Sequence, residues 1–94
     1  MKYRINRWLV SYRITEEQVD RFESLALSLG LKIDVRYIYT QSPSQWKELD
    51  RIFFYDGEKR TEKNTMAEII RKANGEYELV VYDKKINGRW KEYS

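Results

Sequence analysis

The chain has 94 residues, of which 41% are hydrophobic and 35% are charged, and it contains neither histidine nor cysteine. Its length and composition predict one folded domain covering residues 1–94 rather than a wholly disordered chain. Because histidine and cysteine are absent, the sequence excludes the common hydrolase triads, thiol chemistry and zinc sites that use these side chains.

The formal net charge of +3 is too small to indicate a nucleic-acid partner by itself. Basic side chains gather in residues 1–13 and 84–94, whereas residues 15–29 are mainly acidic. No apolar stretch approaches the roughly 18 residues that a membrane span needs, or the roughly 7–15 residues of a signal-peptide core. We therefore expect a cytoplasmic protein with no membrane association.

Two elements are predicted in the first third of the chain. Residues 3–14 are rich in aromatic and branched side chains, which predicts a strand. A helix is predicted to begin after Thr15, because Thr15 and Gln18 have the spacing of a capping box and Gly30 supplies a stop signal. Apolar residues at helical spacing form one buried stripe in this segment: Val19, Phe22, Leu25, Ala26 and Leu29.

The middle of the chain predicts two strands. Apolar and polar side chains alternate over residues 31–40, which is typical of a strand, and residues 42–49 have the Ser-Pro-Ser-Gln signals of a short helical turn. A further strand over residues 51–55 runs into a tight Asp-Gly turn, with residues 58–60 as the short returning arm of the hairpin. Two pairs compete for the core-facing side of this strand: Ile52 with Phe54, and Phe53 with Tyr55.

Three elements are predicted in the last third. Thr65 and Glu68 have capping-box spacing ahead of an apolar stripe, so residues 65–73 are predicted to form a second helix. Residues 77–82 are predicted to form a strand. The Asn87-Gly88 pair predicts another tight turn, followed by a last strand over residues 89–93.

This order predicts an α+β fold of the ferredoxin-like type, β-α-β-β-α-β, with an extra C-terminal hairpin strand. Both helices are expected to cover one face of a mainly antiparallel sheet. A right-handed crossover through residues 15–30 would make the first two strands parallel. The alternative is an α+β sheet of simple hairpins with helices packed across it.

Two helices on one face would leave the other face of the sheet open. Strand alternation places cationic and aromatic side chains there, together with one aromatic pair from residues 51–55. The candidate binding residues on this face are Arg7, Arg13, Arg36, Tyr82, Arg89, Lys91 and Tyr93. Trp46 is a further candidate as an exposed anchor, although tryptophan also packs readily into a core.

These residues favour a small non-catalytic binding or regulatory protein, such as an inhibitor or adaptor of the kind that phages and mobile elements encode. Tyr, Trp and Arg dominate protein interfaces, so a protein partner is expected before a nucleic acid, and an edge strand could pair two copies into a homodimer. The first alternative is a module for single-stranded nucleic acid, in which cations hold phosphates and bases stack on rings. The RNP1 pattern of RNA-recognition motifs is absent from the sequence.

The second alternative is a histidine-free nuclease that uses a metal ion or Lys, Arg and Tyr side chains. Four acidic residues near predicted loops are the candidates for holding magnesium: Asp50, Asp56, Glu58 and Asp83. No motif organises them, and solvated turn acids are far commoner than such sites. We therefore expect no cofactor, no metal site and no catalytic residue.

Overall fold

The computed structural model describes residues 7–37, 48–72 and 74–93. Along the chain it contains β1 (Val10–Ile14), α1 (Glu16–Ser28), β2 (Lys32–Tyr37), β3 (Glu48–Tyr55), β4 (Thr65–Lys72), β5 (Tyr77–Val81) and α2 (Lys84–Tyr93). The protein is therefore α+β, as the sequence predicts. No helix in the described ranges is both long and apolar enough to cross a membrane.

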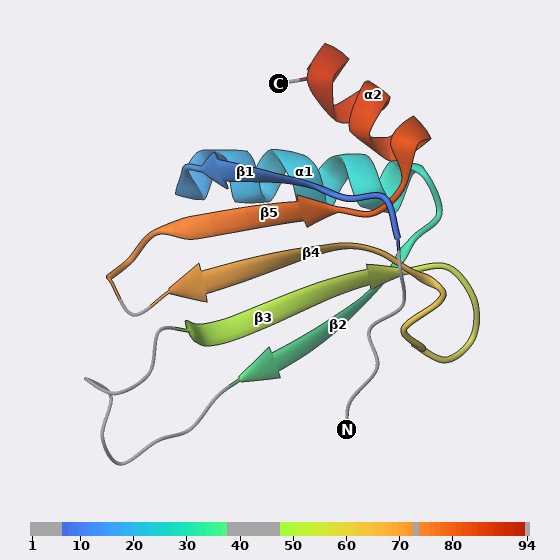
Figure 1. Ribbon diagram of the computed structural model, residues 1–94, viewed down its shortest axis with the longest axis horizontal. Coiled ribbons are helices and arrows are strands. Elements are labelled where there is room, and N and C mark those ends of the chain that lie inside the picture. Colours follow the sequence, from blue (N-terminus) through green and yellow to red (C-terminus); the bar gives the residue numbers. More distant parts are fainter. Residues whose placement is uncertain (1–6, 38–47, 73, 94) are drawn as a thin grey trace.

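The strands form one five-stranded sheet in the order β1-β5-β4-β3-β2, and every neighbouring pair is antiparallel (Figure 1). Consecutive strands from β2 to β5 pair with one another, and β1 closes the sheet against β5. The chain therefore travels from one edge of the sheet to the other through α1. β1 and β2 lie at opposite edges with three strands between them, and they run in the same direction, as the sequence-based expectation of two parallel first strands requires.

The local signals around α1 correctly predict where this helix begins and ends. Thr15 Oγ1 accepts a hydrogen bond from the Gln18 backbone N–H at 3.2 Å, and Gln18 Oε1 accepts one from the Thr15 N–H at 2.9 Å. The two bonds complete the predicted capping box. Gly30 follows the helix with φ +80°, the left-handed conformation that glycine adopts without steric cost.

The second predicted helix, over residues 65–73, is wrong, because this segment forms β4. Ala67 and Ile69 are buried in the core and alternate along the strand with Glu68 and Ile70. Both edges of this segment find partners in β3 and β5, so sheet hydrogen bonds outweigh the local helical spacing. With a strand here and a helix after β5, the described elements do not follow the ferredoxin-like order.

The predicted last strand over residues 89–93 is also wrong, because the chain from Lys84 to Tyr93 is α2. Asp83 starts this helix, since its Oδ1 accepts hydrogen bonds from the backbone N–H groups of Lys85 and Ile86 at 2.9 and 3.0 Å. Ile86 and Trp90 are four residues apart and both are buried. The Asn87-Gly88 pair therefore lies inside a helix and not in a hairpin turn.

The loop between β3 and β4 replaces the predicted tight hairpin. Residues 58–60 form no returning strand, and the next strand begins only at Thr65. The predicted helical turn over residues 42–49 lies mostly outside the described residues, and β3 already begins at Glu48. Phe54 is fully buried and Ile52 packs against the core, so this pair faces inward and Phe53 faces the other side of the sheet.

Phe22 joins three elements at the centre of the core. Its ring centroid lies 5.0 Å from that of Phe54 on β3 and 5.4 Å from that of Trp90 on α2, with both pairs edge to face. Such aromatic pairs contribute about 0.5–1.5 kcal/mol each beyond the area they bury. Side chains of both helices thus enter the same core cluster as those of the strands.

We expect Trp90→Ala to lower the free energy of unfolding by about 3–5 kcal/mol, because it removes a buried ring and leaves a cavity beside Phe22. Urea denaturation followed by far-UV circular dichroism measures this change. Tyr93→Ala is the matched control, since Tyr93 lies on the same helix but is 51% exposed against 2% for Trp90. Its effect should stay within about 0.5 kcal/mol. Similar losses in the two variants would contradict the packing of α2 into the core.

Candidate functional site

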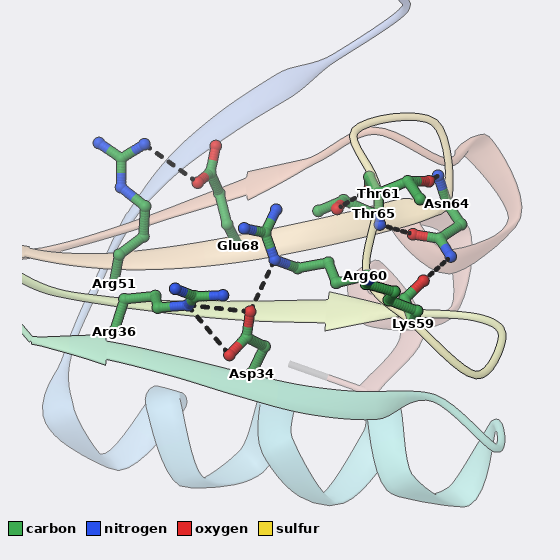
Figure 2. Close-up of polar contacts among 9 residues, drawn as sticks. All are labelled: Asp34, Arg36, Arg51, Lys59, Arg60, Thr61, Asn64, Thr65 and Glu68. Carbon is green, nitrogen blue, oxygen red and sulfur yellow. Dashed lines mark hydrogen bonds and ion pairs between the residues drawn. The ribbon is translucent and has the colours of Figure 1, made fainter.

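The face of the sheet opposite the hydrophobic core, here called the outer face, carries most of the polar side chains of the strands. The strand register aligns these residues in two rows that cross the sheet. One row contains Asp34, Phe53, Glu68, Val80 and Ser11, and the next contains Arg36, Arg51, Ile70, Glu78 and Arg13. In Figure 2 the charged side chains of β2, β3 and β4 extend from the strands on the side away from α1.

Asp34 on β2 is held between two arginines. The Nε of Arg60 lies 2.8 Å from its Oδ2, and the Nε of Arg36 lies 3.1 Å from the same oxygen (Figure 2). The hydrogen bond from Arg60 is the main cause of a lowered pKa of the Asp34 carboxyl; partial burial opposes it, and Arg36 adds to the lowering. Asp34 is therefore firmly ionised at neutral pH.

Arg60 also stacks on an aromatic ring of the outer face. Its guanidinium carbon lies 3.9 Å from the centroid of the Phe53 ring, well within the range of a cation–π contact. The Arg60 side chain thus donates a hydrogen bond to Asp34 from its Nε, and its guanidinium group lies over the ring of Phe53. This arrangement links β2 to β3 through a residue of the loop.

Asn64 fixes the loop that carries Arg60. Its Oδ1 accepts from the Thr61 N–H and its Nδ2 donates to the Lys59 carbonyl, both at 2.7 Å. Thr65 Oγ1 donates to the Thr61 carbonyl at 2.6 Å, and Figure 2 shows these contacts closing the loop on itself. The position of Arg60 is therefore defined by hydrogen bonds on both sides of it.

Glu68 is the buried carboxylate of the outer face, with a side chain that is only 9% exposed. Its Oε1 accepts a hydrogen bond from the Tyr82 hydroxyl. Its Oε2 lies 3.5 Å from a terminal nitrogen of Arg51, which is an ion pair rather than a hydrogen bond, and no hydrogen-bond donor among the described residues reaches this oxygen. The charge of Glu68 is therefore balanced mainly by Arg51.

Tyr82 and Arg7 complete the cluster beside Glu68. Burial, with a further contribution from the hydrogen bond to Glu68, raises the pKa of the Tyr82 phenol, so it stays protonated and acts as a donor. The guanidinium of Arg7 lies 5.0 Å from the Tyr82 ring centroid. It also donates to the carbonyls of Glu62 and Thr65, at 2.9 and 2.7 Å. Arg7 thus ties the segment before β1 to the β3–β4 loop.

The structure brings together only part of the predicted binding set. Arg13 and Arg36 lie on the outer face, and Arg7 and Tyr82 lie beside Glu68. Arg13 is the loosest of these, because its side chain is 81% exposed and its Nε is 3.7 Å from Glu76.

The other predicted residues lie elsewhere. Arg89, Lys91 and Tyr93 are exposed positions of α2 rather than residues of a sheet strand. Their predicted place on the open face is therefore wrong, because the segment is helical. Trp46 lies outside the described residues.

Sequence reasoning missed three residues that build the cluster, Arg51, Arg60 and Glu68, and it left open whether Phe53 faces the core. Phe53 and Arg51 follow from the strand alternation of β3 once Phe54 is known to face inward. Glu68 would follow from the same alternation in β4, but its spacing from Thr65 resembles a helix cap. Arg60 lies in a loop whose conformation no local sequence pattern predicts. Within the described ranges, no group of three or more acidic side chains is placed to hold a metal ion.

Comparisons with models of protein families, with curated proteins and with solved structures found no match to this chain. The function proposed below therefore rests on the residues of the chain and their geometry.

We expect Arg60→Met to raise the pKa of Asp34 more than Arg36→Met does, because the hydrogen bond from Arg60 is the largest cause of the lowering. Titration of the Asp34 carboxyl carbon by NMR measures both changes. Since the pKa of Asp34 is lowered in the folded protein, its charge stabilises the fold above the ordinary pKa near 3.8, and this stabilisation is lost as the pH falls through the lowered value. A larger rise in Arg36→Met would contradict the assignment.

Proposed function

We propose that this protein is a small non-catalytic binding protein, such as an inhibitor or adaptor, that acts on a protein partner through its outer face. One observation carries this proposal: the arginines that gather on and beside the outer face have carboxylates or backbone carbonyls of the same chain as partners. Asp34 engages Arg36 and Arg60, Glu68 engages Arg51, and two carbonyls engage Arg7.

This pairing favours a protein partner over single-stranded nucleic acid. A cation gains binding free energy from a phosphate largely because condensed counterions are released. An arginine that already holds a carboxylate must first exchange that partner, and the nearby acid repels the phosphate. The acids Asp34, Glu68 and Glu78 lie in the same two rows as the arginines, so the outer face is a mixed-charge surface.

The composition and rigidity of the outer face agree with protein recognition. Arginine and aromatic side chains dominate the residues that contribute most to protein interfaces. Phe53 with its stacked Arg60, and Tyr82 with Arg7 above its ring, supply such side chains in fixed positions. Their hydrogen bonds reduce the conformational entropy that binding would otherwise cost.

The proposal takes the outer face to be free of both helices and places the protein in the cytoplasm. The contact between Phe22 and Trp90 supports the first point, because it draws α2 into the core together with α1. The absence of cysteine from the sequence is consistent with a reducing compartment and supports the second.

In a second form of the same proposal, the protein partner is another copy of this chain, and the two copies form a homodimer. The last strand that was expected to pair two copies is part of α2, so pairing through main-chain hydrogen bonds would use β1 or β2, the two edges of the sheet. Exposed apolar side chains stand at both edges: Trp8 and Leu9 before β1, and Val35 on β2. Exposed apolar side chains at a sheet edge favour strand addition.

Photo-crosslinking in cells that express the protein tests the outer face directly. We expect a benzophenone amino acid at Ser11, an exposed outer-face position, to form a discrete protein adduct that Arg36→Glu weakens. The same probe at Ser24, an exposed position of α1, is the matched control and should not form it. Identical adducts from both positions, or none from position 11, would refute the proposal.

The nucleic-acid alternative predicts a different outcome. An adduct at position 11 would then be degraded by nuclease, and a fluorescent oligonucleotide would bind with an affinity that falls steeply as salt is raised. Arg7→Ala and Arg13→Ala would weaken that binding. We expect a nuclease-resistant adduct and no such salt-dependent affinity.

A further inference from the structure

A groove of about 580 Å³ lies beside α2, away from the outer face. It is bordered by the end of α1, the start of β4 and the length of α2. Its apolar lining consists of Leu29, Leu31, Met66 and Ile86, which rest on the hydrophobic core. No residue of the outer-face rows lines it, so the two surfaces are separate.

Three charged residues of α2 form a stripe along this groove, which Asp56 and Asp83 also line. Lys85, Arg89 and Glu92 line the groove at spacings of four and three residues, which places them on one side of the helix. None of the three forms an ion pair with another residue of the described ranges. This differs from the outer face, where the arginines are paired.

The order of these charges also opposes the helix dipole. Lys85 lies in the first turn of α2, where backbone N–H groups favour a negative charge, and Glu92 lies in the last turn, where carbonyls favour a positive one. Lys85 and Arg89 are like charges four residues apart, a spacing at which they repel. Helix stability therefore does not account for a lysine at the start of α2 and a glutamate at its end.

Gly88 lies on the groove wall between these charges. Glycine weakens a helix interior, and here neither a positive φ nor a close neighbour requires it, because a Cβ at this position would meet no atom within 4 Å. The missing side chain leaves the middle of the groove open and lets a ligand approach the helix backbone.

We propose that this groove binds a segment of a protein partner that carries apolar side chains between an acidic and a basic residue. The acidic residue lies against Lys85 and Arg89, and the basic residue lies against Glu92. Because α2 rises about 1.5 Å per residue, the two charges of the segment are about 10 Å apart along the groove. The apolar side chains fill the space over Ile86 and Gly88.

Selection from a phage library of random dodecapeptides against the full chain tests this proposal. We expect enriched peptides to combine apolar residues with one acidic and one basic residue. Lys85→Glu and Glu92→Lys should each weaken the binding of these peptides about tenfold, and a peptide with the matching charge reversed should recover it. Both substitutions agree with the helix dipole, so α2 is retained.

Two further variants complete the test. Gly88→Ala should also weaken binding, since a Cβ at this position meets no atom within 4 Å in the free protein and takes up space in the groove. Lys91→Glu is the control, because Lys91 lies on α2 but does not line the groove. No enriched peptide, or peptides whose affinity responds equally to Lys91→Glu and to the groove variants, would overturn the proposal. Neither result would bear on the outer face.

Discussion

The burial of Glu68 is the constraint on which the outer face depends. A carboxylate that is withdrawn from water loses far more solvation free energy than one hydrogen bond restores, so it must have charged and polar partners nearby. Arg51 and Tyr82 supply them, and Tyr82 in turn lies under Arg7. Arg51 and the Tyr82 hydroxyl are thereby committed to the fold.

This commitment gives the protein two surfaces of different character. On the outer face the arginines already have partners within the chain. Arg7 and Arg60 also hold the rings of Tyr82 and Phe53 in place. Such a surface suits contacts with another folded protein that leave the ion pairs intact. The groove along α2 is the opposite case, since its exposed residues Lys85, Arg89 and Glu92 form no ion pair with another described residue.

The parts of this fold that the sequence predicts are those with local causes. α1 is predictable because Thr15, Gln18 and Gly30 act within a few residues of one another. β4 is not predictable in this way, because the spacing of Thr65 and Glu68 resembles a helix cap. Pairing with β3 and β5 makes this segment a strand instead. The same holds for the candidate site: strand alternation is enough to put Arg36 on the same face as Asp34, but Arg60 reaches Asp34 only through the folded β3–β4 loop.

A double-mutant cycle on Arg51 and Glu68 tests the central claim most directly, because it isolates their coupling free energy from their other contacts. Arg51→Met, Glu68→Gln and the double variant would be compared by urea denaturation, beside the same cycle for Arg13 and Glu76, an exposed pair at 3.7 Å. The account predicts a coupling above about 1 kcal/mol for Arg51 and Glu68 and a value near zero for the exposed pair. Equal, negligible couplings would contradict the claim that the buried carboxylate of Glu68 holds Arg51.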